Sequence, residues 1–185
     1  MAADQGTFDH LVLATLDLGA TARWIERETG VAPSPGGQHV GRGSRNMLCS
    51  LGPARYLEIV GPDPEQADPP VPRPFGIDGL AQPALVAWAI AVPDVAAAIS
   101  AARAAGHDPG DDASMERRRP DGVVLRWRLT PWRSAAVPFL IDWGDTPHPA
   151  ATSAPGLALD GLAARYPDPP VLERILLALG GRLRV

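Results

Sequence analysis

The chain has 185 residues and a mass of 19.5 kDa, with 45% hydrophobic and 21% charged residues, a composition typical of a folded domain rather than a disordered chain. Its net charge of −4 and pI near 5.5 argue against a general binder of nucleic-acid phosphates. All 17 basic residues are arginines, which excludes a P-loop, Schiff-base or pyridoxal lysine.

The sequence shows neither a membrane span nor a targeting segment. No apolar run approaches the ~20 residues that a membrane-spanning helix needs, and residues 1–10 lack the basic and apolar regions of a signal peptide. The single cysteine, Cys49, excludes an intramolecular disulfide and a cysteine-rich zinc ribbon. We therefore expect a cytoplasmic protein that binds neither membranes nor nucleic acid, and we leave a homodimer open.

A repeated pattern marks three helices. Each copy contains an aspartate, then an amphipathic segment, then a glycine. The three pairs are Asp17 and Gly30, Asp94 and Gly106, and Asp168 and Gly180. Aspartate caps a helix N-terminus by accepting backbone N–H groups, and glycine ends a helix where a positive φ is needed. The spacing predicts a helix of about three turns in each interval.

Strand-like runs surround the first two helices. One apolar run begins at His10 and another at Ala87, each directly before a helix. Further runs separated by turn residues follow, over residues 45–51, 55–60, 113–118, 123–130 and 137–143. The turns predict antiparallel hairpins. The Pro/Gly-rich residues 31–38 are expected to form a loop, and the only basic run, 117–119, to be solvated.

Together these elements predict an α+β fold. Two tandem βαβββ units would form a curled mixed sheet around a cleft, and a C-terminal strand–helix extension would follow. The predicted boundaries are 1–78 for the first unit with its linker, 79–150 for the second unit, and 151–185 for the extension.

Three segments of the chain resemble a known family. DHLVLATLD, GGQHVGRGSRN and YLEIVGPDP, which begin at residues 9, 36 and 56, are similar to glyoxalase-like domain proteins of the vicinal oxygen chelate superfamily. The resemblance extends from Phe8 to Trp143. It implies a small-molecule site in the sheet cleft, but this superfamily includes lyases, isomerases, dioxygenases, epimerases and metal-free drug-binding proteins, so it does not fix the reaction.

Strand alternation selects the residues that face the cleft. His10 shares one face of its strand with Val12 and Ala14, and Glu58 shares one face with Tyr56 and Val60. A glutamate inside an apolar strand is costly to bury without a partner. The resemblance places His10 and Glu58 at the two metal-ligand positions of a first unit, where a divalent ion would suit imidazole and carboxylate.

The corresponding positions of the second unit carry no ligand. They are occupied by Ala87 and Ile141, and Asp142 lies one residue out of register. If a metal is bound, we expect His39 or His148 to supply the third protein ligand. The cofactor prediction is therefore a divalent metal ion with an incomplete ligand set, or no cofactor.

Six residues are candidates for substrate binding because they can present a polar group or an aromatic wall to the cleft. They are His39, Asn46, Trp88, Arg126, Arg128 and Trp143. The two arginines alternate with apolar residues and share one strand face, which makes an anion clamp if that face is the cleft side.

Two functions remain open from the sequence. In the first, the protein is a lyase or isomerase of the glyoxalase-like type, and His10 and Glu58 abstract a proton next to a carbonyl, with or without a metal. In the second, it is a metal-free protein that binds and sequesters a small molecule.

Overall fold

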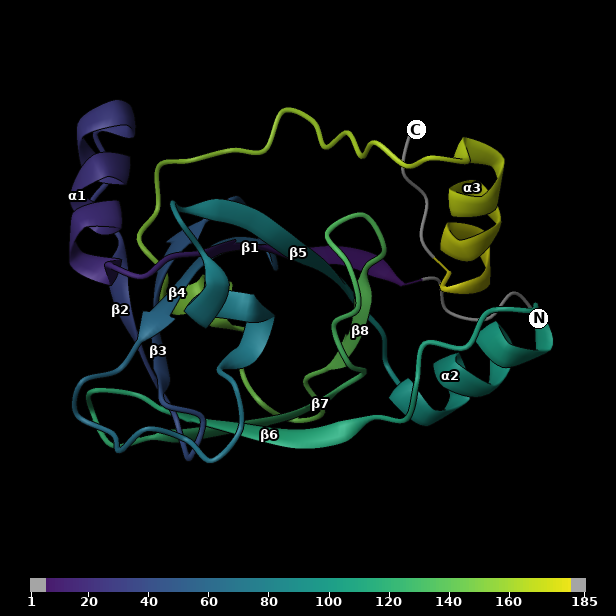
Figure 1. The fold of residues 1–185 in the computed structure, drawn as a ribbon, viewed down its shortest axis with the longest axis horizontal. Coiled ribbons are helices and arrows are strands. Elements are labelled where there is room, and N and C mark those ends of the chain that lie inside the picture. Colours follow the sequence, from purple (N-terminus) through teal and green to yellow (C-terminus); the bar gives the residue numbers. More distant parts are fainter. Residues whose placement is uncertain (1–5, 181–185) are drawn as a thin grey trace.

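The structure is a computed structural model that describes residues 6–180 (Figure 1). Residues 1–5 and 181–185, at the ends of the first and third predicted segments, lie outside the described residues. Eight strands form one sheet closed into a barrel, in the order β1-β4-β3-β2-β6-β7-β8-β5. The strands are β1 (Thr7–Ala14), β2 (Ser34–His39), β3 (Ser44–Ser50), β4 (Tyr56–Pro62), β5 (Ala84–Ala91), β6 (Ala113–Arg118), β7 (Val124–Leu129) and β8 (Phe139–Asp142).

Helices cover the outside of this barrel. They are α1 (Leu18–Thr29), α2 (Val95–Ala104) and α3 (Pro169–Ala178). Of the two short 3₁₀ helices, η2 (Pro149–Thr152) contacts β3, whereas η1 (Pro74–Gly79) packs Ile77 into the barrel interior. In Figure 1, α1 lies at one side of the barrel, whereas α2 and α3 lie next to each other at the opposite side. No helix within residues 6–180 is long and apolar enough to cross a membrane.

The mixed α+β fold is confirmed, and the sheet is a closed barrel rather than an open cleft. β1 pairs in parallel with β4, and β5 pairs in parallel with β8. All other neighbouring strands pair antiparallel, and the β1–β5 and β2–β6 pairs close the barrel. Closure brings β6 beside β2, so residues distant in the sequence share one interior.

The predicted helix caps are confirmed. Asp17 accepts a hydrogen bond from the backbone N of Ala20 at 2.8 Å, and Asp94 and Asp168 make the equivalent contacts at 2.9 Å and 3.2 Å. Gly30 ends α1 with a φ of 75°, the left-handed conformation that favours glycine. The repeated pattern therefore marks each helix correctly.

Two predictions about local structure are wrong. The expected loop at 31–38 contains β2, because its backbone pairs with β3 on one side and β6 on the other. The expected strand before α3 is absent, since residues 157–168 pair with no strand. This segment crosses the molecule toward α3 in Figure 1, and its alternating apolar side chains pack on the outer core without a hydrogen-bonded partner strand.

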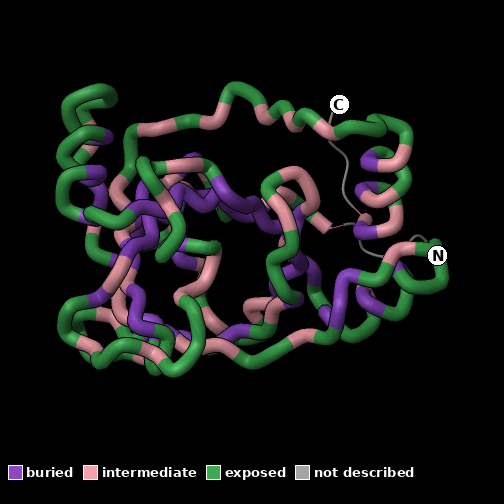
Figure 2. Tube along the Cα trace, in the orientation of Figure 1, coloured by how far each residue is buried: buried purple, intermediate pink, exposed green. Residues whose placement is uncertain are grey.

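Apolar side chains separate the barrel interior from the layer beneath the helices. Val12, Ala14 and Val60 belong to the interior cluster, whereas Leu11 packs in the layer that α2 and α3 cover. In Figure 2 buried residues gather along the barrel strands, and helix surfaces and loops are exposed. The alternation predicted for β1 after residue 10 and for β4 is thus observed.

Candidate active site

The barrel holds a partly open cavity of about 350 Å³. Polar residues from β1, β2, β3, β4 and β6 line one part of it, and aromatic and aliphatic side chains line the rest. The buried polar residues are His10, His39, Asn46, Tyr56, Glu58 and Arg117, and the exposed Arg42 and Asp111 also contribute to the lining. The apolar wall includes Phe75, Trp127, Trp132, Phe139, Ile141 and Trp143. An apolar pocket with a few convergent polar groups is the usual form of a small-molecule site.

A bulge in β1 changes which side chains reach the interior. Phe8 pairs with Ile90 and Leu11 pairs with Trp88, so two residues of β1 lie opposite one residue of β5. These two residues are Asp9 and His10. A bulge breaks the strict alternation of a strand. It allows the Asp9 and His10 side chains to meet, with Asp9 Oδ1 2.5 Å from His10 Nδ1.

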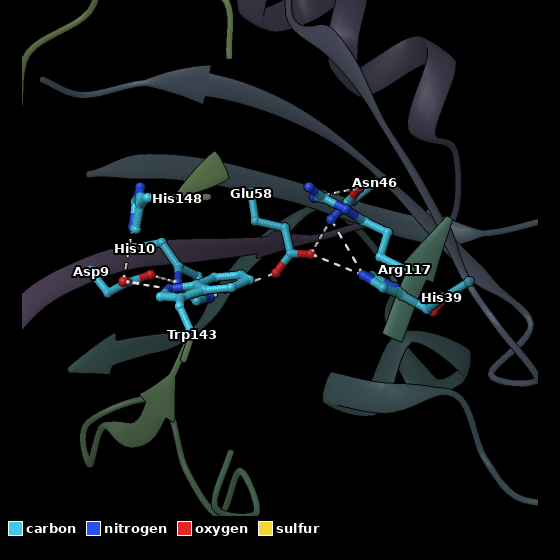
Figure 3. Close-up of polar contacts among 9 residues, drawn as sticks. Asp9, His10, His39, Asn46, Glu58, Arg117, Trp143 and His148 are labelled. Carbon is cyan, nitrogen blue, oxygen red and sulfur yellow. Dashed lines mark hydrogen bonds and ion pairs between the residues drawn. The ribbon is translucent and has the colours of Figure 1, made fainter. Parts of the chain in front are cut away.

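Asp9 is fully buried and is the centre of a hydrogen-bond cluster (Figure 3). Its second oxygen, Oδ2, accepts from Trp143 Nε1 at 2.9 Å and lies 3.0 Å from His148 Nε2. Burial opposes ionisation of Asp9, but the hydrogen bonds from His10 and His148 outweigh it and hold the pKa of the carboxyl well below its usual range. Asp9 is therefore an ionised acceptor, which directs Nδ1–H of His10 toward it and leaves His10 Nε2 facing Glu58.

Glu58 lies between two groups of polar residues (Figure 3). On one side its Oε2 is 3.9 Å from His10 Nε2. On the other side its Oε1 accepts a 2.6 Å hydrogen bond from Asn46 Nδ2 and lies 3.5 Å from His39 Nε2. The predicted placement of His10 and Glu58 in one cavity on adjacent strands is thus observed.

Arg117 is buried inside the barrel, with 3% of its surface exposed. The prediction that it belongs to a solvated basic run is wrong, because alternation along β6 turns Arg117 inward while Arg118 is exposed. Its Nη1 donates to Asn46 Oδ1 at 3.3 Å. Asn46 therefore links the Arg117 guanidinium to the Glu58 carboxylate. Burial lowers the pKa of Arg117 from its ordinary value.

His39 lies beside this link. Its Nδ1 is 3.0 Å from Ser44 Oγ, and its ring meets Trp127 edge-on at a centroid distance of 6.4 Å. Burial lowers the pKa of His39, while Glu58 opposes this shift and the Arg117 cation adds to it. His39 is consequently a neutral side chain at neutral pH.

Two glycines of β2 make room for the Asn46 and Arg117 side chains. A Cβ atom on Gly36 would lie 2.1 Å from Asn46 Oδ1, and one on Gly37 would lie 2.1 Å from the backbone oxygen of Arg118 and 3.1 Å from Arg117 Cγ. Any larger residue at position 36 would collide with the Asn46 amide. The two glycines thus allow a close approach within a strand, where the sequence predicted a loop.

Of the remaining candidates from the sequence, some lie in or beside the cavity and others lie away from it. Trp143 lines the cavity, and His148 contacts Asp9. Trp88 lies on the other side of β5, in the core beneath α2 and α3, so it does not line the cavity. Arg126 and Arg128 share one face as predicted, but that face is the exposed outside of β7, where they pair with Glu116 and Asp112.

Among the residues that sequence reasoning missed are Arg117 and Trp127, which line the cavity, and Asp9, which contacts His10. Strict alternation assigns Asp9 to the face opposite His10, and only the bulge brings it in. A usable signal was present, since an aspartate inside an apolar strand needs a buried partner. For Arg117 and Trp127 the signal is their inward parity on β6 and β7, which requires knowledge of the barrel's inner face.

The donor set does not fit a tightly held catalytic metal. Ala87 and Ile141 offer no donor atom, and Asp142 accepts from the backbone N of Val95 and Gly144 instead. Within residues 6–180 no group of three His, Cys, Asp or Glu side chains is arranged to hold an ion. Characterised catalytic zinc sites typically use three protein ligands.

Neither His39 nor His148, the two candidates for a third metal ligand, is positioned to complete a metal site with His10 and Glu58. The His39 side chain is near Glu58, but the Asn46 amide occupies the same Glu58 oxygen. His148 contacts Asp9. The cluster has the pattern of a hydrogen-bonded acid–base site.

Comparisons with solved structures show the same fold at low sequence identity. A hypothetical protein from Staphylococcus aureus matches with a TM-score of 0.52 and 16% identity, over 78% of this chain and 61% of that chain. Methylmalonyl-CoA epimerase from Mycobacterium tuberculosis matches with a TM-score of 0.51 and 18% identity, over 82% of this chain and 95% of that chain. A hypothetical protein from Bacillus halodurans matches with a TM-score of 0.50 and 13% identity, over 77% and 96%.

A search of curated proteins finds no match to the chain. The family model of the glyoxalase-like domain, in contrast, matches residues 8–180, which include every strand from β2 to β8, all three helices and all the polar residues of the cavity. This match establishes that the chain belongs to the glyoxalase-like domain family.

Proposed function

We propose that this protein is an isomerase or lyase that abstracts a proton next to a carbonyl group of a small substrate inside the barrel. One observation carries the proposal: His10 Nε2 and Glu58 Oε2 lie 3.9 Å apart in a largely apolar cavity. A hydrogen-bond partner fixes the position of each group: Asp9 contacts His10, and Asn46 donates to Glu58. Two positioned proton acceptors in such a cavity suit general acid–base chemistry.

Glu58 is the base in this mechanism. Its Oε1 is engaged with Asn46, so Oε2 is the oxygen available to take a proton from the substrate carbon. His10, with its proton on Nδ1, presents Nε2 beside the same position and exchanges the proton with Glu58 or returns it to the product. Asp9 acts as a positioning residue, because its carboxylate determines which nitrogen of His10 carries the proton.

Negative charge that develops on the substrate oxygen needs a nearby donor. Burial, with a further contribution from Asp9 and Glu58, raises the pKa of Tyr56 well above its ordinary value, so the phenol stays protonated. Tyr56 lines the cavity and stacks on His10 at a centroid distance of 4.5 Å. A protonated phenol and the Arg117 cation are groups that can stabilise an enolate in a largely apolar cavity.

The two halves of the chain contribute differently to this site, which supports dividing it into two βαβββ units at 1–78 and 79–150. The first half supplies His10, His39, Asn46 and Glu58, whereas the second half supplies Arg117 and most of the aromatic wall. The parallel pairs β1–β4 and β5–β8 follow the same division. We propose that the acid–base groups of one unit act on a substrate held by the other.

Hydrogen–deuterium exchange at carbon tests the proposal. Purified protein is incubated in D₂O with a panel of small 2-oxo acids, hydroxyketones and aldehydes, and deuterium next to the carbonyl is followed by proton NMR. The proposal expects protein-dependent exchange in at least one compound. If compounds bind in the cavity but none exchanges faster with protein than without it, the enzyme proposal fails and the alternative, a small-molecule binding protein, replaces it.

A further inference from the structure

Two buried N–H donors, on residues that line the cavity, have no acceptor among the residues that the structure describes. They are Nε of Arg117 and Nε1 of Trp127. Buried polar groups in folded proteins are nearly always hydrogen-bonded, and each one left unpaired costs about 1–3 kcal/mol. Because both residues line the same cavity, a bound molecule can supply the missing acceptors.

The two donors belong to neighbouring positions on one face of the sheet. Arg117 of β6 pairs with Leu125 of β7, and Trp127 pairs with Met115. Arg117 and Trp127 are therefore diagonal neighbours, and diagonal pairs lie about 7–8 Å apart, within reach of a common group for such long side chains. A single group with two acceptor atoms can contact both.

The charge of this part of the cavity selects the kind of acceptor. Arg117 is a buried cation whose recorded hydrogen bond goes to the neutral Asn46 amide. No ion pair joins it to a carboxylate within residues 6–180, and the neighbouring His39 is neutral at neutral pH. Arg42 also lines the cavity but is exposed, so Arg117 is the buried cation that a ligand would meet. Its single positive charge matches one negative charge, while a dianionic group would face repulsion from Glu58. The planar guanidinium matches a carboxylate in particular.

The position of Arg117 relative to Glu58 determines how a bound ligand would be oriented in the cavity. In Figure 3, Arg117, Asn46 and His39 lie on one side of Glu58, and the His10–Asp9 pair lies on the other. An acid group on Arg117 therefore places the adjoining carbon atoms near Glu58. The rest of the ligand meets the apolar wall that Phe139, Ile141 and Trp143 help to form.

We propose that the substrate is a small monocarboxylate with an apolar body, and that its carboxylate binds Arg117 and Trp127. This inference deepens the proposed function and rests on it only for what happens at the carbon beside Glu58. Carboxylate binding itself requires no turnover, so it is tested separately.

Calorimetric titration of the whole chain with phenylacetate and its neutral isostere phenylacetamide tests the binding site. We expect phenylacetate to bind about 10–100-fold more tightly, the usual contribution of a charge-assisted hydrogen-bond pair. Arg117→Met should abolish this preference, while the control Arg118→Met, at the next and exposed position of β6, should retain it. Equal binding of the two probes, or a preference that survives Arg117→Met, would overturn the proposal.

Two further variants keep the test decisive if Arg117→Met does not fold. Arg117→Lys retains the charge without the planar fork and should bind phenylacetate more weakly than the wild type. Trp127→Phe removes the indole N–H and should weaken phenylacetate binding several-fold. If phenylacetate, phenylpyruvate and 4-methylpentanoate all fail to bind at millimolar concentration, the carboxylate assignment is wrong.

Glu58→Gln separates this inference from the proposed function. Removing the Glu58 charge should leave phenylacetate affinity unchanged or higher, because less repulsion faces the bound carboxylate. Carboxylate preference without any carbon exchange would retain the site and reject the enzyme. Exchange on neutral carbonyl compounds without carboxylate preference would retain the enzyme and reject the site.

Discussion

Replacing Asp9 by asparagine tests whether the buried Asp9 cluster holds the site together. The substitution keeps the shape of the side chain but removes the charge that His10 and His148 approach at 2.5 Å and 3.0 Å. Breaking a buried charged pair costs about 3–5 kcal/mol. For a chain of this length, 1 kcal/mol corresponds to about 2–4 °C, so we expect the melting temperature to fall by about 6–20 °C.

The pH dependence of this loss follows from the depressed pKa of Asp9. A carboxyl whose folded pKa lies below its unfolded value of 3.8 contributes its stability above that value and loses it as the pH falls toward the folded pKa. The gap in melting temperature between wild type and Asp9→Asn should therefore be full at pH 7 and smaller at pH 3. Differential scanning calorimetry at both pH values measures it.

Asp94→Asn is the matched control for this substitution. Asp94 is exposed and caps α2, and asparagine caps a helix about as well as aspartate. Its cost should be at most about 1 kcal/mol. An Asp9→Asn protein as stable as the Asp94→Asn protein, with the same gap at pH 3 and pH 7, would refute the assignment of Asp9 as an ionised centre of the cluster.

Three further outcomes follow from the cavity and its surroundings. Gly36→Ala should weaken phenylacetate binding and lower the melting temperature, because its Cβ would meet Asn46. The control Gly79→Ala, with open space at its Cβ, should change neither, and unchanged binding in Gly36→Ala would contradict this expectation. Burial raises the pKa of the Cys49 thiol to about 11. Disulfide reagents at pH 7 should therefore modify Cys49 far more slowly in the native than in the unfolded protein, and equal rates would contradict its burial. Elemental analysis of protein purified without added metal should find less than one divalent ion per chain, and a stoichiometric ion whose removal abolishes exchange would contradict the metal-free mechanism.

Regular local patterns made much of the fold predictable. The aspartate caps and terminal glycines located α1, α2 and α3, because capping chemistry depends only on nearby residues. Strict alternation along β4 placed Glu58 on the correct face. The strand β2 was not predicted because its proline and glycines are typical of a loop. Only its pairing with β3 and β6 identifies it as a strand.

The candidate site was less predictable because it depends on irregularity and on closure of the barrel. The bulge that brings Asp9 to His10 has no signature in the alternation of apolar residues. Arg126 and Arg128 were correctly grouped on one face, but periodicity cannot say whether a face is inside or outside. Arg117 could not be predicted as a site residue from the sequence, because its place in the site depends on the pairing of β6 with β2 in the closed barrel.

The most direct test of the account is the exchange rate of Glu58→Gln on whichever carbonyl compound the wild-type protein deuterates. The substitution preserves the shape of the side chain and removes its ability to accept a proton. We expect carbon exchange to fall by about 10²–10⁴-fold, while binding of the same compound changes little. A Glu58→Gln protein that exchanges its substrate at the wild-type rate would show that Glu58 is not the base, and would contradict the central claim.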